Sequence, residues 1–233
     1  MLMSIIKPLQ LSFLAKKKDE LSFPRKMKFK KRKQGLIVLS KEAQKVDSKT
    51  IINVYKSITH NLLKLESGQT LTCSQTGAII KKENNGTVKG KNNQGTYSIT
   101  LNNKKFFIKF SSAVRADLNR AGLLGSAKLI KKYFKNTTNS VRVITPHIIY
   151  LQNQKGLIVT DYIDTHEAIS IHDALINPAK PLIPKEAIEN FNRAQTLLKN
   201  NGFFDVESHN AFYHFKTKNV LLFDINCFDE FVV

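Results

Sequence analysis

Three polar residues near the C-terminal end of the chain have the types and spacing of a site for a phosphate-bound metal ion. They lie in residues 202–226, GFFDVESHNAFYHFKTKNVLLFDIN, where four residues separate Asp205 from Asn210 and Asp224 ends an apolar run. Carboxylate and amide oxygens bind Mg²⁺ in phosphate sites, and a further carboxylate can accept the proton of an attacking hydroxyl. The spacing predicts a loop in which Asp205 is a catalytic base and Asn210 binds metal, followed by a hairpin that brings Asp224 beside them.

A lysine in the apolar segment KKFFIKF supplies the cation that phosphoryl transfer also needs. Lys109 has Ile108 and Phe110 as neighbours, and successive side chains of a strand point to opposite faces. We therefore expect Lys109 to point away from the apolar pair, toward phosphates. Taken alone, Lys109 also fits a surface lysine on a half-exposed strand, and Asp205 and Asn210 also fit ordinary turn residues.

The segments around these residues predict strands first and helices later. Alternating apolar residues in residues 95–110, GTYSITLNNKKFFIKF, predict a hairpin that turns at Asn102 and Asn103. Apolar residues recur at helical spacing, or as short strand-like runs, in several other segments. The predicted helices cover residues 121–134 and 184–202, and the other predicted strands lie within residues 69–85, 141–152 and 155–164.

The N-terminal part of the chain differs in composition from the rest. Residues 1–50 hold 14 Lys and Arg against 4 Asp and Glu, a net charge of +10 out of +19 for the whole chain. We expect residues 1–46 to form a basic, flexible arm, whose cluster PRKMKFKKRK, residues 24–33, predicts an acidic partner. Apolar spacing predicts an amphipathic helix over residues 47–68.

Composition also narrows the expected location. No apolar run approaches the ~20 residues that cross a bilayer, so we expect no transmembrane segment. The N-terminus lacks the charge order and cleavage site of a classical signal peptide. These features favour a cytoplasmic protein or one exported without cleavage.

In the order strand lysine, helix, two strands, long helix, D-x4-N loop and strand-terminal Asp, the chain resembles the protein kinases. It resembles more closely the small type III-secreted effector kinases of the NleH and OspG kind. Asp205 lacks the usual preceding His-Arg, and Asp-Ile-Asn at residues 224–226 replaces Asp-Phe-Gly. The resemblance implies an α+β, bilobal protein-kinase-like fold, with an antiparallel β-rich N-lobe over residues 69–164 and a truncated α-helical C-lobe over residues 165–233.

The resemblance also implies an activity, its cofactors and a partner. These are Ser/Thr protein kinase activity with ATP and Mg²⁺, and a host protein as substrate, for an effector that a bacterium secretes into the host cell. Carried over by position, Asp205 is the catalytic base, Asn210 and Asp224 are metal ligands, and Lys109 binds the ATP phosphates.

Two further positions follow the family pattern only in part. The best match to the glycine-rich loop is LTCSQTGAII, in which Gly77 is the residue expected to contact ATP. The helix after Lys109 contains no glutamate, so Asp117 is the acid available to pair with the lysine. Nine residues follow Asp224, so we expect substrate recognition to come from the N-terminal 70 residues, from the surface of the helix after Lys109 or from a bound partner.

Two alternatives remain open. A pseudokinase would use the same fold as a scaffold for a host signalling or ubiquitin-pathway protein, and it would tolerate the loss of Asp205 and Asp224. A basic nucleic-acid-binding protein would lose affinity with salt and on deletion of residues 16–33. No recognised RNA or DNA motif accompanies the basic cluster, which disfavours nucleic acid as the partner.

Overall fold

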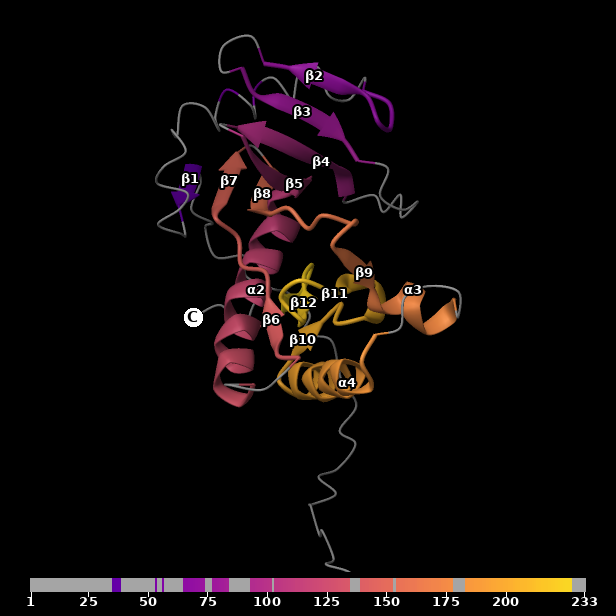
Figure 1. Cartoon of the computed structure of the whole chain (residues 1–233). Helices are drawn as coiled ribbons and strands as arrows, with labels where there is room; N and C mark the ends of the chain where they lie inside the picture. The colour runs from indigo at the N-terminus through magenta and orange to yellow at the C-terminus, as the bar shows by residue number, and fades with distance from the viewer. Residues whose placement is uncertain are drawn as a thin grey trace, which may run out of the picture. The chain divides into compact units, whose positions relative to one another are not determined.

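The computed structural model has a mixed α+β fold (Figure 1). It describes residues 35–38, 53, 56, 65–73, 77–83, 93–101, 103–134, 139–152, 154–177 and 183–227. The elements of these residues follow one another as β1 (Gly35–Val38), β2 (Thr70–Thr72), β3 (Ile79–Lys82), β4 (Asn93–Leu101), β5 (Lys104–Ser112), α2 (Ala113–Tyr133), β6 (Val141–Val143), β7 (Ile148–Gln152), β8 (Lys155–Asp161), β9 (Ala168–Ser170), α3 (Ile171–Ile176), α4 (Lys185–Asn200), β10 (Phe203–Phe204), the 3-10 turn η3 (Ser208–Asn210), β11 (Ala211–His214), β12 (Asn219–Leu222) and β13 (Asn226–Cys227).

The first part of the fold is an antiparallel sheet in the order β1-β7-β8-β5-β4-β3-β2. The predicted hairpin of β4 and β5 is present, with Asn103 at a φ of 61° in its turn. Alternate residues of β5, Phe106, Ile108 and Phe110, are buried in the core on one face of the sheet. Lys109 therefore projects from the opposite face, as the strand periodicity predicts.

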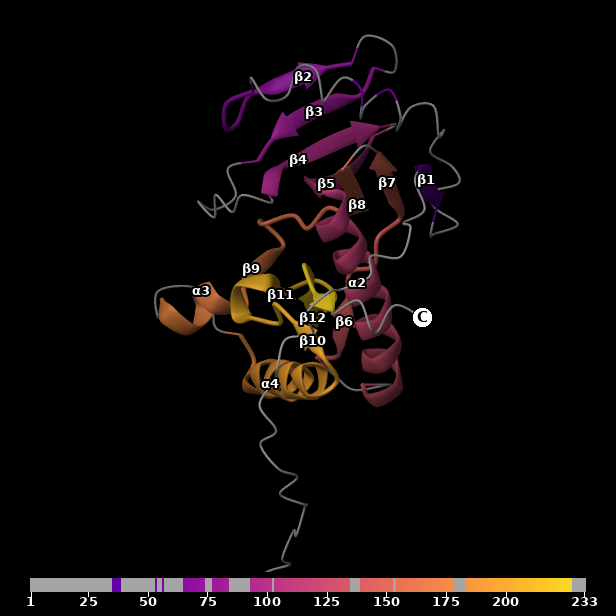
Figure 2. The same ribbon diagram turned by 180° about the vertical axis from the view of Figure 1, so that it is seen from behind.

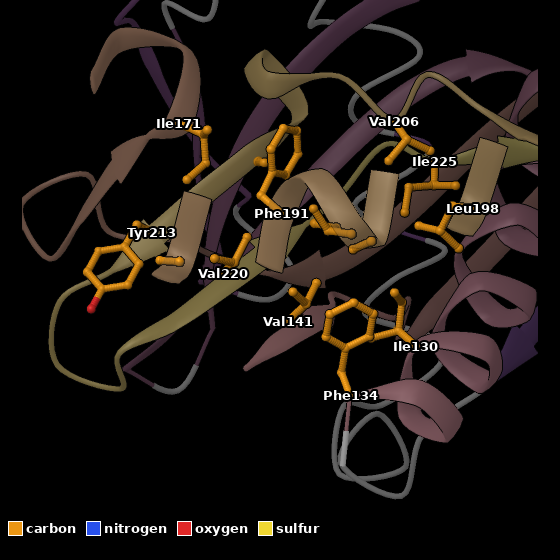
Figure 3. Close-up of a cluster of buried hydrophobic side chains, with 14 of the residues drawn as sticks. Ile130, Phe134, Val141, Ile171, Phe191, Leu198, Val206, Tyr213, Val220 and Ile225 are labelled. Carbon is orange, nitrogen blue, oxygen red and sulfur yellow. The ribbon is translucent and has the colours of Figure 1, made fainter. Parts of the chain in front are cut away.

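The second part contains α3, α4 and two small sheets. One has the order β6-β12-β11-β9 and the other pairs β10 with β13. Residues Ala187, Phe191, Ala194 and Leu198 recur at helical spacing and bury one face of α4. They join a core with β11, β12 and the C-terminal half of α2 (Figure 3). The predicted α+β class, with a β-rich part before a smaller part that carries the later helices, is confirmed.

Helix α2 contacts both parts, and both views show it running from the large sheet to the smaller elements (Figures 1 and 2). It begins at Ala113, because the Ser112 hydroxyl accepts a hydrogen bond from the Arg115 N–H at 3.2 Å and caps the helix. Gly156 of β8 lets the helix lie close to the sheet, since a Cβ there would stand 2.4 Å from Cβ of Ala116.

Several boundaries differ from those predicted. Strand β1 lies inside residues 1–46, which were predicted as a flexible arm, yet it pairs with β7. Strand β6 lies inside residues 69–164 but pairs in parallel with β12 of the second part. The basic cluster at residues 24–33 lies outside the described residues, as does most of the helix predicted over residues 47–68. Among the described residues, no helix has the length and apolar character to cross a membrane.

Candidate active site

An ion pair joins two sequence candidates that lie 115 residues apart in the chain. The Lys109 ammonium, at the middle of β5, donates to Oδ1 of Asp224, which follows β12. Their side chains are 13% and 29% exposed, respectively. A charge pair that is partly withdrawn from water is attracted more strongly than a surface pair. The structure thus places the predicted phosphate-binding cation directly beside a predicted metal ligand.

Helix α2 fixes the position of Asp224. The backbone of Asp224 is left-handed, with a φ of 54°, which turns its side chain out of the strand direction. Asn119 is buried, and its Nδ2 donates both to Oδ1 of Asp224 at 3.1 Å and to the Ile225 carbonyl at 2.9 Å. Asn119 therefore holds the carboxylate and the backbone that carries it in one arrangement.

The predicted D-x4-N segment closes into a loop. Nδ2 of Asn210 donates to the Asp205 carbonyl at 2.8 Å, across the 3-10 turn at residues 208–210. The Phe223 N–H donates to the Asn210 carbonyl at 3.0 Å, which ties this loop to the residue before Asp224. The structure therefore brings Asp205, Asn210 and Asp224 together, as their spacing predicts.

Asp205 also receives two side-chain donors. Its Oδ2 accepts from Nη2 of Arg115 at 2.7 Å and from Nδ2 of Asn226 at 2.6 Å. The same Nδ2 of Asn226 donates to the Asp224 carbonyl at 3.2 Å. One buried amide thus connects the two acidic residues.

Two side-chain oxygens of the site are candidate metal ligands. Among the described residues, none donates a hydrogen bond to Oδ2 of Asp224 or to Oδ1 of Asn210. The described part of the chain holds no cluster of three or more His, Cys, Asp and Glu side chains that suits a metal. Mg²⁺ is commonly bound by one or two carboxylates together with phosphates and water, so Asp224 and Asn210 fit Mg²⁺ brought in with a nucleotide.

The structure does not bring Gly77 to this site. Gly77 precedes β3, whose Ile79 pairs with Thr100 of β4, and Thr100 in turn pairs with Lys105 of β5. Ile79 is therefore level with Lys105, four residues or about 13 Å along the strand from Lys109, and Gly77 lies two residues farther from Lys109. The strand order explains why Gly77 is not at the site. The connection that lies beside the Lys109 end of β5 runs from β3 to β4, and residues 84–92 of this connection lie outside the described residues.

The structure also corrects the partner predicted for Lys109. Asp117 accepts from Nε and Nη2 of Arg120 at 2.9 and 2.8 Å, three residues along the same helix, while Lys109 pairs with Asp224. Helix α2 starts so soon after β5 that Arg115 and Asn119, rather than Asp117, face the site.

Sequence reasoning missed three residues of the site: Arg115, Asn119 and Asn226. Arg115, Asn119 and Gly122 follow one another at four and three residues, so they share one face of α2. That spacing is a usable signal, but it does not show which face of the helix meets the site. Asn226 gives no comparable signal, because its contacts arise from the pairing of β10 with β13.

Outside the site, three ionisable side chains of the described residues have shifted pKa values. A hydrogen bond with Nε2 of His147 at 2.8 Å holds the pKa of the Asp161 carboxyl below its ordinary value of 3.8, against the opposing effect of burial. Burial raises the pKa of Tyr97. Burial and then the nearby Glu186 raise the pKa of Tyr213.

Comparisons with known proteins give partial matches to kinase structures. No protein-family model matches the chain, and no curated protein matches its sequence. Vaccinia related kinase 3 matches with 19% identity and a TM-score of 0.40, over 73% of this chain and 54% of that one. The BubR1 kinase domain matches with 9% identity and a TM-score of 0.37, over 80% and 60%.

The autoinhibited serine kinase domain of titin matches with 13% identity and a TM-score of 0.39, over 57% of this chain and 40% of that one. The matched parts cover about half the length of these structures. All three are kinase structures. All three TM-scores are below 0.5, so these matches carry no argument about chemistry. The similarity to secreted effector kinases stays a prediction.

Proposed function

We propose that the protein is an atypical, minimal Ser/Thr protein kinase that transfers the γ-phosphoryl group of ATP to a protein hydroxyl. One observation carries the proposal: Lys109, Asp224 and Asp205 come from three separate segments and meet in one hydrogen-bonded network. A lysine, a metal-binding carboxylate and amide, and a second carboxylate are the parts that phosphoryl transfer requires.

Each residue has a separate task in this proposal. Among the described residues Lys109 uses one of its three ammonium donors, on Asp224, which leaves two for phosphate oxygens. Asp224 and Asn210 offer the metal-binding oxygens. Asp205 accepts the proton of the acceptor hydroxyl while the hydroxyl oxygen attacks the γ-phosphorus. The bond between that phosphorus and the ADP oxygen breaks, and its electron pair stays with ADP. When bound, Mg-ATP supplies the phosphoryl group and neutralises phosphate charge.

The partial exposure of the two acids is consistent with these tasks. Asp224 is 29% exposed and Asp205 37%, so both carboxylates can be reached from solvent although their donors are partly buried. The secretion into a host cell and the identity of a host target remain proposals that rest on the sequence resemblance.

Transfer of labelled phosphate from Mg-ATP to a mixture of Ser- and Thr-containing proteins tests this function. Asp205→Asn should lower the rate by at least about 100-fold while Mg-ATP still stabilises the fold, because it removes the base and leaves the nucleotide ligands. Asp224→Asn should abolish both transfer and stabilisation. Glu189→Gln removes an exposed acid of α4 and serves as the charge-matched control. Transfer by Asp205→Asn at the wild-type rate would contradict the proposal.

A further inference from the structure

One oxygen of Asp205 is held by two donors from different parts of the chain. Nη2 of Arg115, on α2, lies 2.7 Å from Oδ2, and Nδ2 of Asn226, in β13, lies 2.6 Å from the same atom. Among the described residues, none donates a hydrogen bond to Oδ1 of Asp205. Hydrogen bonds to a charged acceptor are short and directional, so this pair fixes the rotation of the carboxylate.

Asn226 places a polar amide at a fully buried position, which lowers the stability of the fold. It is 0% exposed, and its Oδ1 is one of the buried side-chain atoms of the described residues that have no hydrogen-bond partner. An unpaired buried carbonyl destabilises a fold, so packing alone does not account for an amide here. Its Nδ2 donates to Oδ2 of Asp205 and to the carbonyl of Asp224. The opposite amide orientation would set its oxygen against the Asp205 carboxylate, which can only accept hydrogen bonds.

Arg115 reaches Asp205 from the helix that also holds Asp224. It precedes Asn119 by one turn, and the Asn119 amide donates to Asp224. Strand β5, which carries Lys109, runs directly into this helix. The contacts of Arg115 with Asp205 and of Asn119 with Asp224, together with the direct connection from β5 to α2, therefore set Asp205 at a defined place relative to Asp224 and Lys109.

We propose that Arg115 and Asn226 are positioning residues for Asp205, which hold Oδ2 so that Oδ1 is the oxygen that accepts the proton. The inference rests on the proposed function, and it adds two residues that the catalytic motif does not contain. Because both act on the same oxygen, the loss of either one frees the carboxylate to rotate. Their effects on turnover are therefore not independent.

The test measures ADP formation from Mg-ATP, with water as the acceptor, in the full chain. The variants are Arg115→Gln, Asn226→Ala, their combination and Arg115→Lys. Arg120→Gln is the matched control, because Arg120 lies on the same helix but pairs with Asp117. If Asn226→Ala does not fold, the partly exposed Arg115 still allows the test.

We expect Arg115→Gln and Asn226→Ala each to lower kcat by about 10- to 100-fold, as a misplaced base does. The KM for ATP of Arg115→Gln should stay within about twofold, because among the described residues Arg115 contacts neither Asp224 nor Asn210. The kcat of the double variant should be no lower than that of the less active single variant. Arg115→Lys should recover most of the wild-type kcat. A purely structural role would not give this split between kcat and KM or this rescue.

Other outcomes overturn the inference. An Arg115→Gln protein that behaves like Arg120→Gln would show that Asp205 needs no such support. Losses that multiply in the double variant would show that the two residues act separately. A wild-type protein that Mg-ATP stabilises but that forms no ADP would refute the positioned base and leave the nucleotide site standing. A wild-type protein that Mg-ATP does not stabilise would refute the proposed function itself.

Discussion

Gly122→Ala should disturb the site by pushing α2 away from the segment that carries Asp224. A Cβ at Gly122 would stand 2.4 Å from the Ile225 carbonyl oxygen and 2.6 Å from Cα of Asn226. Both atoms belong to the backbone, so no change of rotamer can relieve the contact. Overpacking of this kind costs about 1–3 kcal/mol, against which alanine returns up to about 1 kcal/mol of helix propensity.

Gly125→Ala is the matched control in the same helix. Its Cβ would meet only the ring of Phe203, at 3.0 and 3.1 Å, and a side-chain ring can turn aside. We expect Gly122→Ala to unfold about 1–3 kcal/mol more easily than Gly125→Ala, which corresponds to a melting temperature lower by roughly 2–12 °C.

Thermal unfolding of both variants, with and without Mg-ATP, measures the effect. Below its melting temperature, Gly122→Ala should also bind Mg-ATP more weakly than Gly125→Ala, because the shifted backbone carries Asp224 with it. Equal stability and equal nucleotide binding in the two variants would refute the close packing of α2 on residues 225–226.

Two further predictions concern charged pairs. Lys109→Met should lower the free energy of unfolding by about 1–3 kcal/mol, because it leaves a partly buried carboxylate without its cation. Combining it with Asp224→Asn should recover most of that loss in urea melts without recovering Mg-ATP binding, whereas an unchanged loss would contradict the ion pair. Asp161→Asn should destabilise the fold at about pH 7 and less at about pH 3. His147 lowers the pKa of Asp161, so the stabilisation by the ionised carboxyl is complete above its unfolded pKa and is lost as the pH falls through the folded value. Melting curves that show the same difference at both pH values would contradict this assignment.

The main parts of the site could be predicted from the sequence because each depends on a local rule. Strand alternation alone decides that Lys109 leaves the apolar face of β5, and burial confirms it. The four-residue gap between Asp205 and Asn210 suits a closed loop, in which the side chain of Asn210 reaches the Asp205 carbonyl. The position of Asp224 also follows from a local rule, because the apolar run before it forms β12, which pairs with β11 and ends beside that loop.

The remaining features depend on contacts between distant segments. Asp117 fits the lysine partner by sequence position, but the start of α2 at Ala113 decides which residues face the site. Gly77 fits the position of a phosphate loop in the sequence order, but the pairing of β3 with β4 sets it at the other end of the sheet. The contact of Asn226 with Asp205 requires the pairing of β10 with β13, which no periodic pattern reveals.

Mg-ATP binding by the wild-type protein and by Asp224→Asn tests the central claim most directly. At about 100 times its dissociation constant, a ligand stabilises a fold by roughly 2.7 kcal/mol, which should raise the melting temperature by about 5–10 °C. We predict that shift for the wild-type protein and for the exposed control Glu189→Gln, and none for Asp224→Asn. No shift in the wild-type protein at millimolar Mg-ATP, or an equal shift in Asp224→Asn, would contradict a nucleotide site built on Lys109 and Asp224.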